Sequence, residues 1–206
     1  MATKSSFKNM TICLTAICLV CSSLLAGIYA ITKDPIDAAQ KVKTTNAIKA
    51  VLPEFGELSE LQTVDVNGKT FKYYTATTNN ELKGWAIESS SVGFGGTLKL
   101  MVGITADGII FNTSVLSQSE TPGLGAKCVE PAFHDQFKQL NPAETVFKVK
   151  KDQGDIDAIT ASTITSRAYL VAVETAVSVY KQLAANTISA TAADESAAEP
   201  VKIEEE

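Results

Sequence analysis

The sequence is poor in the side chains that build metal centres and nucleophilic sites. It has one histidine, His134, and four cysteines, of which only Cys128 lies outside the N-terminal apolar segment. The main part of the chain therefore cannot close a disulfide, and it offers no zinc or iron–sulfur ligand set. No metal site is expected. Cys128 is expected to be a small buried apolar residue, and His134 a helix surface residue.

An excess of charge of one sign is also missing from most of the chain. The formal net charge is −5, and residues 191–206, with six acidic side chains and one lysine, account for all of it. The remainder is formally neutral, so no nucleic-acid partner is expected. The composition predicts that residues 186–206 form an acidic, disordered tail.

A long apolar run lies near the N-terminus. Residues 10–31 contain no charged side chain, and about 20 apolar residues span the hydrocarbon core of a lipid bilayer as a helix. Lys4 and Lys8 precede the run, and this bias predicts that residues 1–9 are cytoplasmic and that the rest of the chain lies outside. The run therefore predicts a single membrane-spanning helix.

A cleaved signal peptide is the alternative interpretation of this run. Its best cleavage site would follow Ala30, which places Ile28 where a small residue is needed. The run is also longer than the apolar core of a signal peptide. A retained anchor is therefore favoured, and residues 32–185 are expected to form one extracytoplasmic domain.

The pattern of residues 32–185 predicts helices packed on an antiparallel sheet. Turn residues such as Asn67-Gly68, Asn79-Asn80 and Asp107-Gly108 separate short apolar runs and predict hairpins. The fold class is therefore α+β, preceded by one N-terminal transmembrane helix. The expected helices are 35–52, 131–140 and 163–185, and the expected strands are 63–66, 69–76, 82–88, 97–104, 109–116 and 145–149.

Two glycine-rich stretches lack the full patterns of known phosphate-binding loops. Residues 93–96 precede a strand and lack the Lys-Ser/Thr of a P-loop, so a flexible hairpin loop is preferred. Residues 123–125 lack the third glycine of a dinucleotide fingerprint. The hexapeptide 120–125 nevertheless begins with an acid and leaves backbone free to approach a ligand, unless it is an ordinary loop.

Hydroxyl side chains crowd the start of the last predicted helix, at Thr160, Ser162, Thr163 and Thr165. Such residues satisfy the free N–H groups of a first helical turn. The same N–H groups and the positive end of the helix dipole attract an anion. The residues alone are compatible with a plain helix cap and with a phosphate site.

Taken together, the chain resembles the FMN-binding subunits of bacterial ion-pumping electron-transfer complexes. The G subunit of the Rnf complex looks like the closer match, and the related C subunit of the sodium-translocating NADH:quinone reductase is the alternative. Residues 120–125 reproduce the Glu-Thr-Pro-Gly-Leu-Gly signature of these subunits. Residues 157–163 are similar to their flavinylation motif, Asp, two residues, Ser/Thr-Gly-Ala-Thr, with Ala161 and Ser162 in place of its Gly and Ala.

The resemblance implies that Thr163 carries FMN through a phosphoester bond. It also implies that a flavin transferase forms this bond and recognises Asp157 and Thr160. Arg167 is a candidate for contact with the phosphate, and Trp85, which strand packing would equally explain, is a weaker candidate for stacking. The other residues expected beside the FMN are Glu120, Thr121, Gly123, Leu124, Gly125, Thr160, Ser162 and Ile164.

The function implied by the resemblance is that of an electron carrier without stand-alone activity. It would work with the other subunits of a bacterial inner-membrane complex that couples electron transfer from ferredoxin to NAD⁺ to ion translocation. Its soluble domain would lie on the extracytoplasmic side. An anchored scaffold domain without a cofactor is the alternative from a different functional class.

Overall fold

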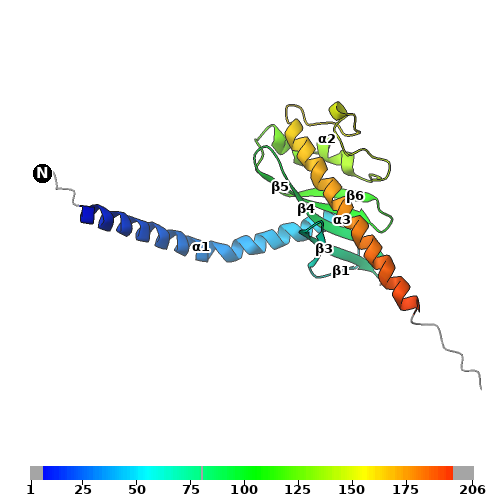
Figure 1. Cartoon of the computed structure of the whole chain (residues 1–206), viewed down its shortest axis with the longest axis horizontal. Helices are drawn as coiled ribbons and strands as arrows, with labels where there is room; N and C mark the ends of the chain where they lie inside the picture. The colour runs from blue at the N-terminus through cyan, green and yellow to red at the C-terminus, as the bar shows by residue number, and fades with distance from the viewer. Residues whose placement is uncertain (1–6, 80, 197–206) are drawn as a thin grey trace, which may run out of the picture. The chain divides into compact units, whose positions relative to one another are not determined.

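The computed structural model describes residues 7–79 and 81–196, and Figure 1 shows the elements in chain order. The chain forms two compact units, residues 1–44 and residues 45–206. Residues 1–6, Asn80 and the last ten residues of the predicted acidic tail, 197–206, lie outside the described residues.

The N-terminal helix α1 runs without interruption from Phe7 to Val51. Two separate helices, 10–31 and 35–52, were expected, but Pro35 lies inside the single helix. A proline removes one backbone hydrogen bond, and the good helix formers on both sides of Pro35 outweigh that local cost. By length and composition, this helix is able to cross a membrane.

The second unit is built on a six-stranded antiparallel sheet with the order β1-β3-β4-β5-β6, in which β2 also pairs with β3. Asn67 and Gly68, with φ of +52° and +75°, form the turn expected of a two-residue hairpin. Five strands occur where the sequence predicted them, and β1 is an addition. The strands are β1 Glu57–Leu58, β2 Gln62–Val66, β3 Lys69–Thr78, β4 Glu81–Val92, β5 Thr97–Thr105 and β6 Ile110–Ser117.

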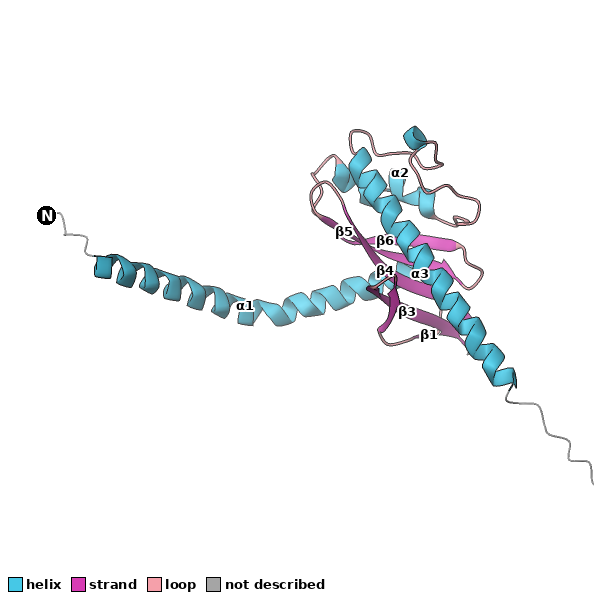
Figure 2. Ribbon diagram, viewed as in Figure 1, coloured by secondary structure: helices cyan, strands magenta, loops and turns pink. Residues whose placement is uncertain are grey.

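Both faces of this sheet are covered, because side chains alternate between faces along each strand. On one face, alternate residues of β5 from Leu98 to Ile104 pack in the main core with helix α3, Thr163–Ser196, which lies across the sheet in Figure 2. On the other face, Met101 packs against Ile48 and Val51 at the end of α1. The α+β class predicted from the sequence is confirmed.

Irregular structure replaces two predicted elements between β6 and α3. The expected helix 131–140 is divided into short turns: η1 Gly125–Val129, α2 Pro131–His134 and η2 Asp135–Phe137. The expected strand 145–149 is absent, because the N–H of Val146 donates to the side chain of Asp155 at 2.7 Å instead of to a neighbouring strand. A single turn, η3 Lys150–Asp152, follows.

Helix α3 extends beyond its predicted end at residue 185 and continues to Ser196. The sequence contains no glycine or proline between residue 163 and Pro200, so the usual stop signals are missing. The first eleven residues of the predicted disordered tail, 186–196, are therefore helical.

Gly103→Ala is expected to destabilise the protein, because an added Cβ would overlap the backbone carbonyl oxygen of Val51. The free energy of unfolding is expected to fall by about 2 kcal/mol, as for other overpacked sites. This corresponds to a decrease of about 4–8 °C in Tm for a chain of this size. Thermal unfolding of the full chain in detergent measures it. Gly56→Ala is the matched control, because its Cβ would meet no atom closer than 3.7 Å. Equal Tm values for the two variants would contradict the prediction.

Candidate functional site

A pocket of about 370 Å³ brings together two segments that are far apart in the sequence. One is the loop 120–125 after β6, and the other is the start of α3, residues 161–165. Phe94, from the loop between β4 and β5, completes the lining. The volume lies within the range of about 300–1,000 Å³ that is typical of small-molecule sites. Both sequence motifs therefore contribute to one site.

Glu120 forms the base of this pocket and is only 6% exposed. Its carboxylate accepts a hydrogen bond from Thr165 Oγ1 at 2.7 Å and another from the backbone N–H of Gly95 at 3.2 Å. The N–H of Glu120 donates to Gln118 Oε1 at 2.6 Å. One buried side chain thus joins three segments: the loop after β6, the β4–β5 loop and the first turn of α3.

The glycines around Glu120 are required because the backbones approach closely. A Cβ on Gly125 would lie 2.5 Å from Glu120 Oε2 and 2.6 Å from Thr165 Oγ1. A Cβ on Gly93 would overlap the Glu120 carboxylate, and one on Gly95 would overlap the carbonyl oxygen of Ser119. The stretch 93–96, interpreted from the sequence as a flexible hairpin loop, is therefore packed tightly against the pocket.

Thr163 is the first residue of α3, and it lines the pocket. The N–H of Ser166 donates to the carbonyl of Ser162 at 3.0 Å, so the N–H groups of residues 163–165 precede the regular helical bonds. These groups and the helix dipole favour an anion at this end. Thr163 is partly exposed, whereas Ser162 is only 8% exposed, so Thr163 offers the more accessible hydroxyl.

Ala161 has a left-handed backbone with a φ of +59°. Glycine adopts this conformation freely, but an L-residue with a Cβ is strained by about 1–2 kcal/mol. Glycine stands at this position in the motif that residues 157–163 resemble. The exchange of that glycine for Ala161 therefore places strain two residues before Thr163, inside the pocket lining.

Three large apolar side chains surround the pocket and remain open to solvent. Phe94 is 70% exposed, Ile164 is 52% exposed and Leu124 is 43% exposed. Apolar walls with a few convergent polar groups are typical of sites for flat aromatic ligands. Phe94 and Thr165 were not among the expected contact residues, although Thr165 belongs to the cluster of hydroxyl residues that the sequence revealed.

Several predicted site residues lie outside the pocket lining. Thr160 and Gly123 are exposed to solvent, and neither lines the pocket. Asp157 forms an ion pair with Lys150 at 2.7 Å, and its side chain is 65% exposed. Its N–H donates to Gln136 Oε1 at 2.8 Å. The structure thus places Asp157 and Thr160 outside the pocket, whereas residues 161–163 belong to its lining.

Arg167 binds a carboxylate rather than reaching toward the pocket. Its Nε and Nη2 atoms donate to the two carboxylate oxygens of Asp152 at 2.8 and 2.9 Å. This hydrogen-bonded pair holds the pKa of Asp152 below its usual range. The phosphate contact considered for Arg167 is therefore not supported by the geometry.

Trp85 is also distant from the pocket lining. It is 5% exposed in the core, and its ring packs edge-on against Tyr180 with a centroid distance of 5.4 Å. It lies on β4 opposite Thr75 and Ile104. Strand packing, the alternative to ligand stacking, therefore explains this tryptophan.

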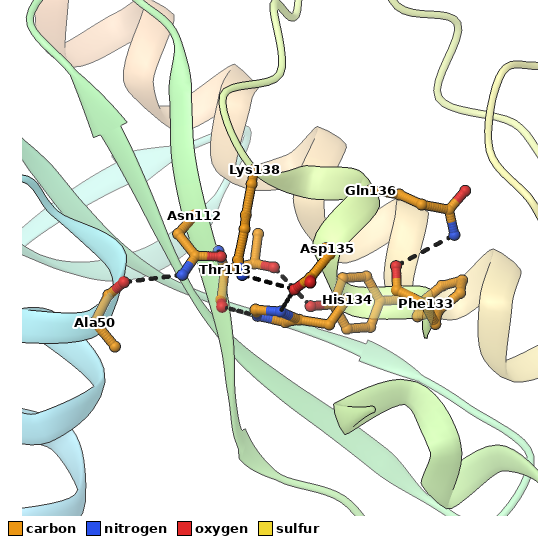
Figure 3. Close-up of polar contacts among 9 residues, drawn as sticks. Ala50, Asn112, Thr113, Phe133, His134, Asp135, Gln136 and Lys138 are labelled. Carbon is orange, nitrogen blue, oxygen red and sulfur yellow. Dashed lines mark hydrogen bonds and ion pairs between the residues drawn. The ribbon is translucent and has the colours of Figure 1, made fainter. Parts of the chain in front are cut away.

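Cys128 and His134 pack within the fold and do not line the pocket. Cys128 is fully buried, as predicted, and burial raises the pKa of its thiol to about 11. His134 is half-buried, unlike the surface residue that was expected. Its Nε2 contacts the carbonyl of Thr113, while Nδ1 lies 3.4 Å from Asp135 Oδ1 (Figure 3). Lys138, whose bond to the same carboxylate is 2.7 Å long, holds the pKa of Asp135 below its usual range.

Comparisons with known proteins identify the family. Residues 93–178 match the FMN-binding domain. The G subunit of the proton-translocating ferredoxin:NAD(+) oxidoreductase complex of Clostridium ljungdahlii is 35% identical over 171 residues, which cover 82% of this chain and 87% of that protein. The chain belongs to the family of G subunits of ion-translocating oxidoreductase complexes.

A second relative supports the same assignment. The G subunit of an ion-translocating oxidoreductase complex of Methanosarcina acetivorans is 30% identical, and the match covers 86% of this chain and 96% of that protein. A solved structure of the C subunit of the Na(+)-translocating NADH-quinone reductase of Parabacteroides distasonis matches with a TM-score of 0.45 and 20% identity, covering 66% of this chain and 79% of that one. The two G-subunit relatives confirm the resemblance inferred from the sequence.

Ala161→Gly is expected to stabilise the protein by about 0.5–1 kcal/mol, because relief of the left-handed strain exceeds the entropy cost of glycine. Urea unfolding of the full chain measures the change. Ala158→Gly is the control, since Ala158 does not have a positive φ. The free energy of unfolding of this variant should fall by about 0.5–1 kcal/mol. Destabilisation by both substitutions would refute the argument from strain.

Thr165→Val is expected to lower the free energy of unfolding by about 1.5–3 kcal/mol, because it removes a donor from a buried carboxylate without changing side-chain shape. Thr175→Val is the matched control. The Thr175 hydroxyl donates only to the carbonyl of Val171, four residues earlier in the same helix. The same urea titration separates the two variants, and equal losses would show that the bond to Glu120 has no special importance.

Proposed function

We propose that the chain is an electron carrier with FMN joined to Thr163 through a phosphoester bond. The carrier would belong to a membrane complex that couples electron transfer from ferredoxin to NAD⁺ to ion translocation. The observation that carries this proposal is the pocket in which Thr163, at the start of α3, lies with residues 120–125. The names of the G-subunit relatives support the assignment to such a complex.

The start of α3 suits the phosphate of FMN. The N–H groups of residues 163–165 and the positive end of a helix of 34 residues stabilise a negative group. Thr163 presents a partly exposed hydroxyl, whereas Ser162 is buried. This difference favours Thr163 over Ser162 as the attachment site.

The remaining lining suits the isoalloxazine ring. Phe94, Leu124 and Ile164 offer exposed apolar surface to an aromatic ligand. FMN supplies the electron-transfer chemistry when it is bound, and the chain tunes that chemistry through burial, hydrogen bonds and charge. The Glu120 carboxylate at the base of the pocket contributes negative potential, which disfavours added negative charge on a nearby ring.

Asp157 and Thr160 suit recognition by an enzyme better than contact with bound FMN. The side chain of Asp157 is 65% exposed, and Thr160 is exposed as well. Neither residue lines the pocket. We assign to them the predicted role in recognition by a flavin transferase during maturation.

The apolar part of α1, residues 10–31, would anchor the carrier in the lipid bilayer. Lys4 and Lys8 before this segment favour a cytoplasmic N-terminus and an extracytoplasmic domain in the bacterial inner membrane. Electrons would then pass between this domain and other subunits of the complex without a diffusing carrier.

Thr163→Ala is expected to abolish covalent flavin, because it removes the acceptor hydroxyl. The full chain is co-expressed with a flavin transferase, and the protein band of a denaturing gel is examined for flavin fluorescence. The wild-type band should fluoresce and the Thr163→Ala band should not. Ser162→Ala is the matched control, and it should keep the signal because the Ser162 hydroxyl is buried.

Fluorescence that survives in Thr163→Ala would overturn the attachment site. A wild-type chain whose intact mass shows no FMN adduct after co-expression would favour the cofactor-free scaffold instead. Mass spectrometry of the tryptic peptide containing residues 160–165 identifies the modified hydroxyl directly.

A further inference from the structure

A second and larger groove lies between strands β3 and β4 and the N-terminal half of α3. Its volume is about 1,100 Å³, which is above the range of about 300–1,000 Å³ that is usual for small-molecule sites. It is separate from the flavin pocket, because the residues that line the two cavities do not overlap. Nothing in the proposed flavin chemistry uses it.

The groove opens where β3 and β4 stop pairing. Their register ends at Lys72 opposite Glu88. In the described part of the chain, residues 69–71 of β3 then pair only with β2, and residues 89–92 of β4 pair only with β5. Both strands therefore present an unpaired backbone edge to the groove. Such edges accept an additional strand by main-chain hydrogen bonding.

A buried hydroxyl faces the same groove. Ser89 lines it and is 2% exposed, and among the described residues its Oγ is the buried side-chain atom for which no hydrogen-bond partner is found. Ser91, two residues further along β4, instead donates to the carbonyl of Ala168 at 2.6 Å. A buried polar atom without a partner is costly, so Ser89 provides an unused hydrogen-bonding group just beneath the surface of the groove.

The walls of the groove indicate the chemistry of its occupant. Phe71 and Val171 offer apolar surface, and Val171 is 53% exposed. Lys69 and Lys72 line the β3 side, whereas Glu88 is the acidic residue of the lining. An extended segment with alternating apolar and acidic side chains would satisfy the strand edges, the apolar wall and the lysines together.

The groove and the flavin pocket share one exposed surface. Val171 follows Ile164 by two turns on α3, and Val92 precedes Phe94 by two residues. All four side chains are more than half exposed, Val92 at 79%. A protein bound in the groove would therefore lie beside the mouth of the flavin pocket, where a redox partner has to approach.

We propose that this groove binds an extended peptide segment of a neighbouring subunit, which adds a strand beside β4 and bonds to the Ser89 hydroxyl. The geometry of the groove does not depend on the proposed function, but the identification of its occupant as a component of the same complex rests on that function. The site docks the electron-transfer partner next to the flavin.

The test compares Ser89→Ala with Ser117→Ala, an exposed serine on β6 outside the groove. The complex is purified through a tag on another subunit, and the amount of this chain that is retained is measured. Ser89→Ala should lower retention by about fivefold, as expected for the loss of one buried hydrogen bond, while Ser117→Ala should not. In the isolated full chain, Ser89→Ala should not lower Tm, because its hydroxyl has no partner to lose.

A photo-crosslinking residue at position 90, in the groove lining, identifies the occupant. The same residue at position 181, which is exposed and outside the groove, is the control. One segment of another subunit should be captured from position 90 alone. Equal retention of both variants, a lower Tm for Ser89→Ala alone, or capture of a second copy of this chain would overturn the proposal. Absence of flavin from the wild-type chain would instead overturn the proposed function, since retention and cross-linking do not depend on the flavin signal.

Discussion

The pocket depends on the buried hydrogen bond between Thr165 and Glu120, which joins residues 45 positions apart. A buried carboxylate is costly unless donors surround it, and Glu120 has two, the Thr165 hydroxyl and the N–H of Gly95. These bonds fix the first turn of α3 relative to two loops. The rest of α3 cannot shift to compensate, because Tyr169 and Val173 are fully buried in the core. The start of α3 is therefore held by the hydrogen bonds at Glu120 and by the core packing of the rest of the helix.

Most of the fold follows from local sequence patterns. The hairpin at Asn67-Gly68 was predictable because its turn requires residues that tolerate positive φ. The segment between β6 and α3 was not predictable, because its backbone bonds go to distant partners. Leu140 exchanges hydrogen bonds with Ile110, and Val146 donates to a side chain rather than to a strand. Local propensity carries no information about such contacts.

The candidate site was predictable in its two motifs but not in its assembly. Residues 120–125 and 157–163 were singled out from the sequence, and the structure brings the first and the end of the second into one pocket. The contribution of Phe94 depends on the tight packing of its glycine-rich loop against Glu120, which no local pattern reveals. Alanine itself gives no sign of the left-handed backbone at Ala161, and the glycine of the resembled motif was its one signal.

The covalent bond that we propose at Thr163 would change what the pocket has to provide. A cofactor held only by contacts would need a deep site that buries most of its surface, whereas Phe94, Leu124 and Ile164 leave this pocket open. If the phosphate were tethered at the helix start as proposed, the local concentration of the ring would be set by the bond rather than by affinity. The pocket can then remain shallow, and its exposed apolar rim is left for a partner to cover. In the proposed carrier, a surface of this kind would bring the flavin and the partner's redox group together without releasing either.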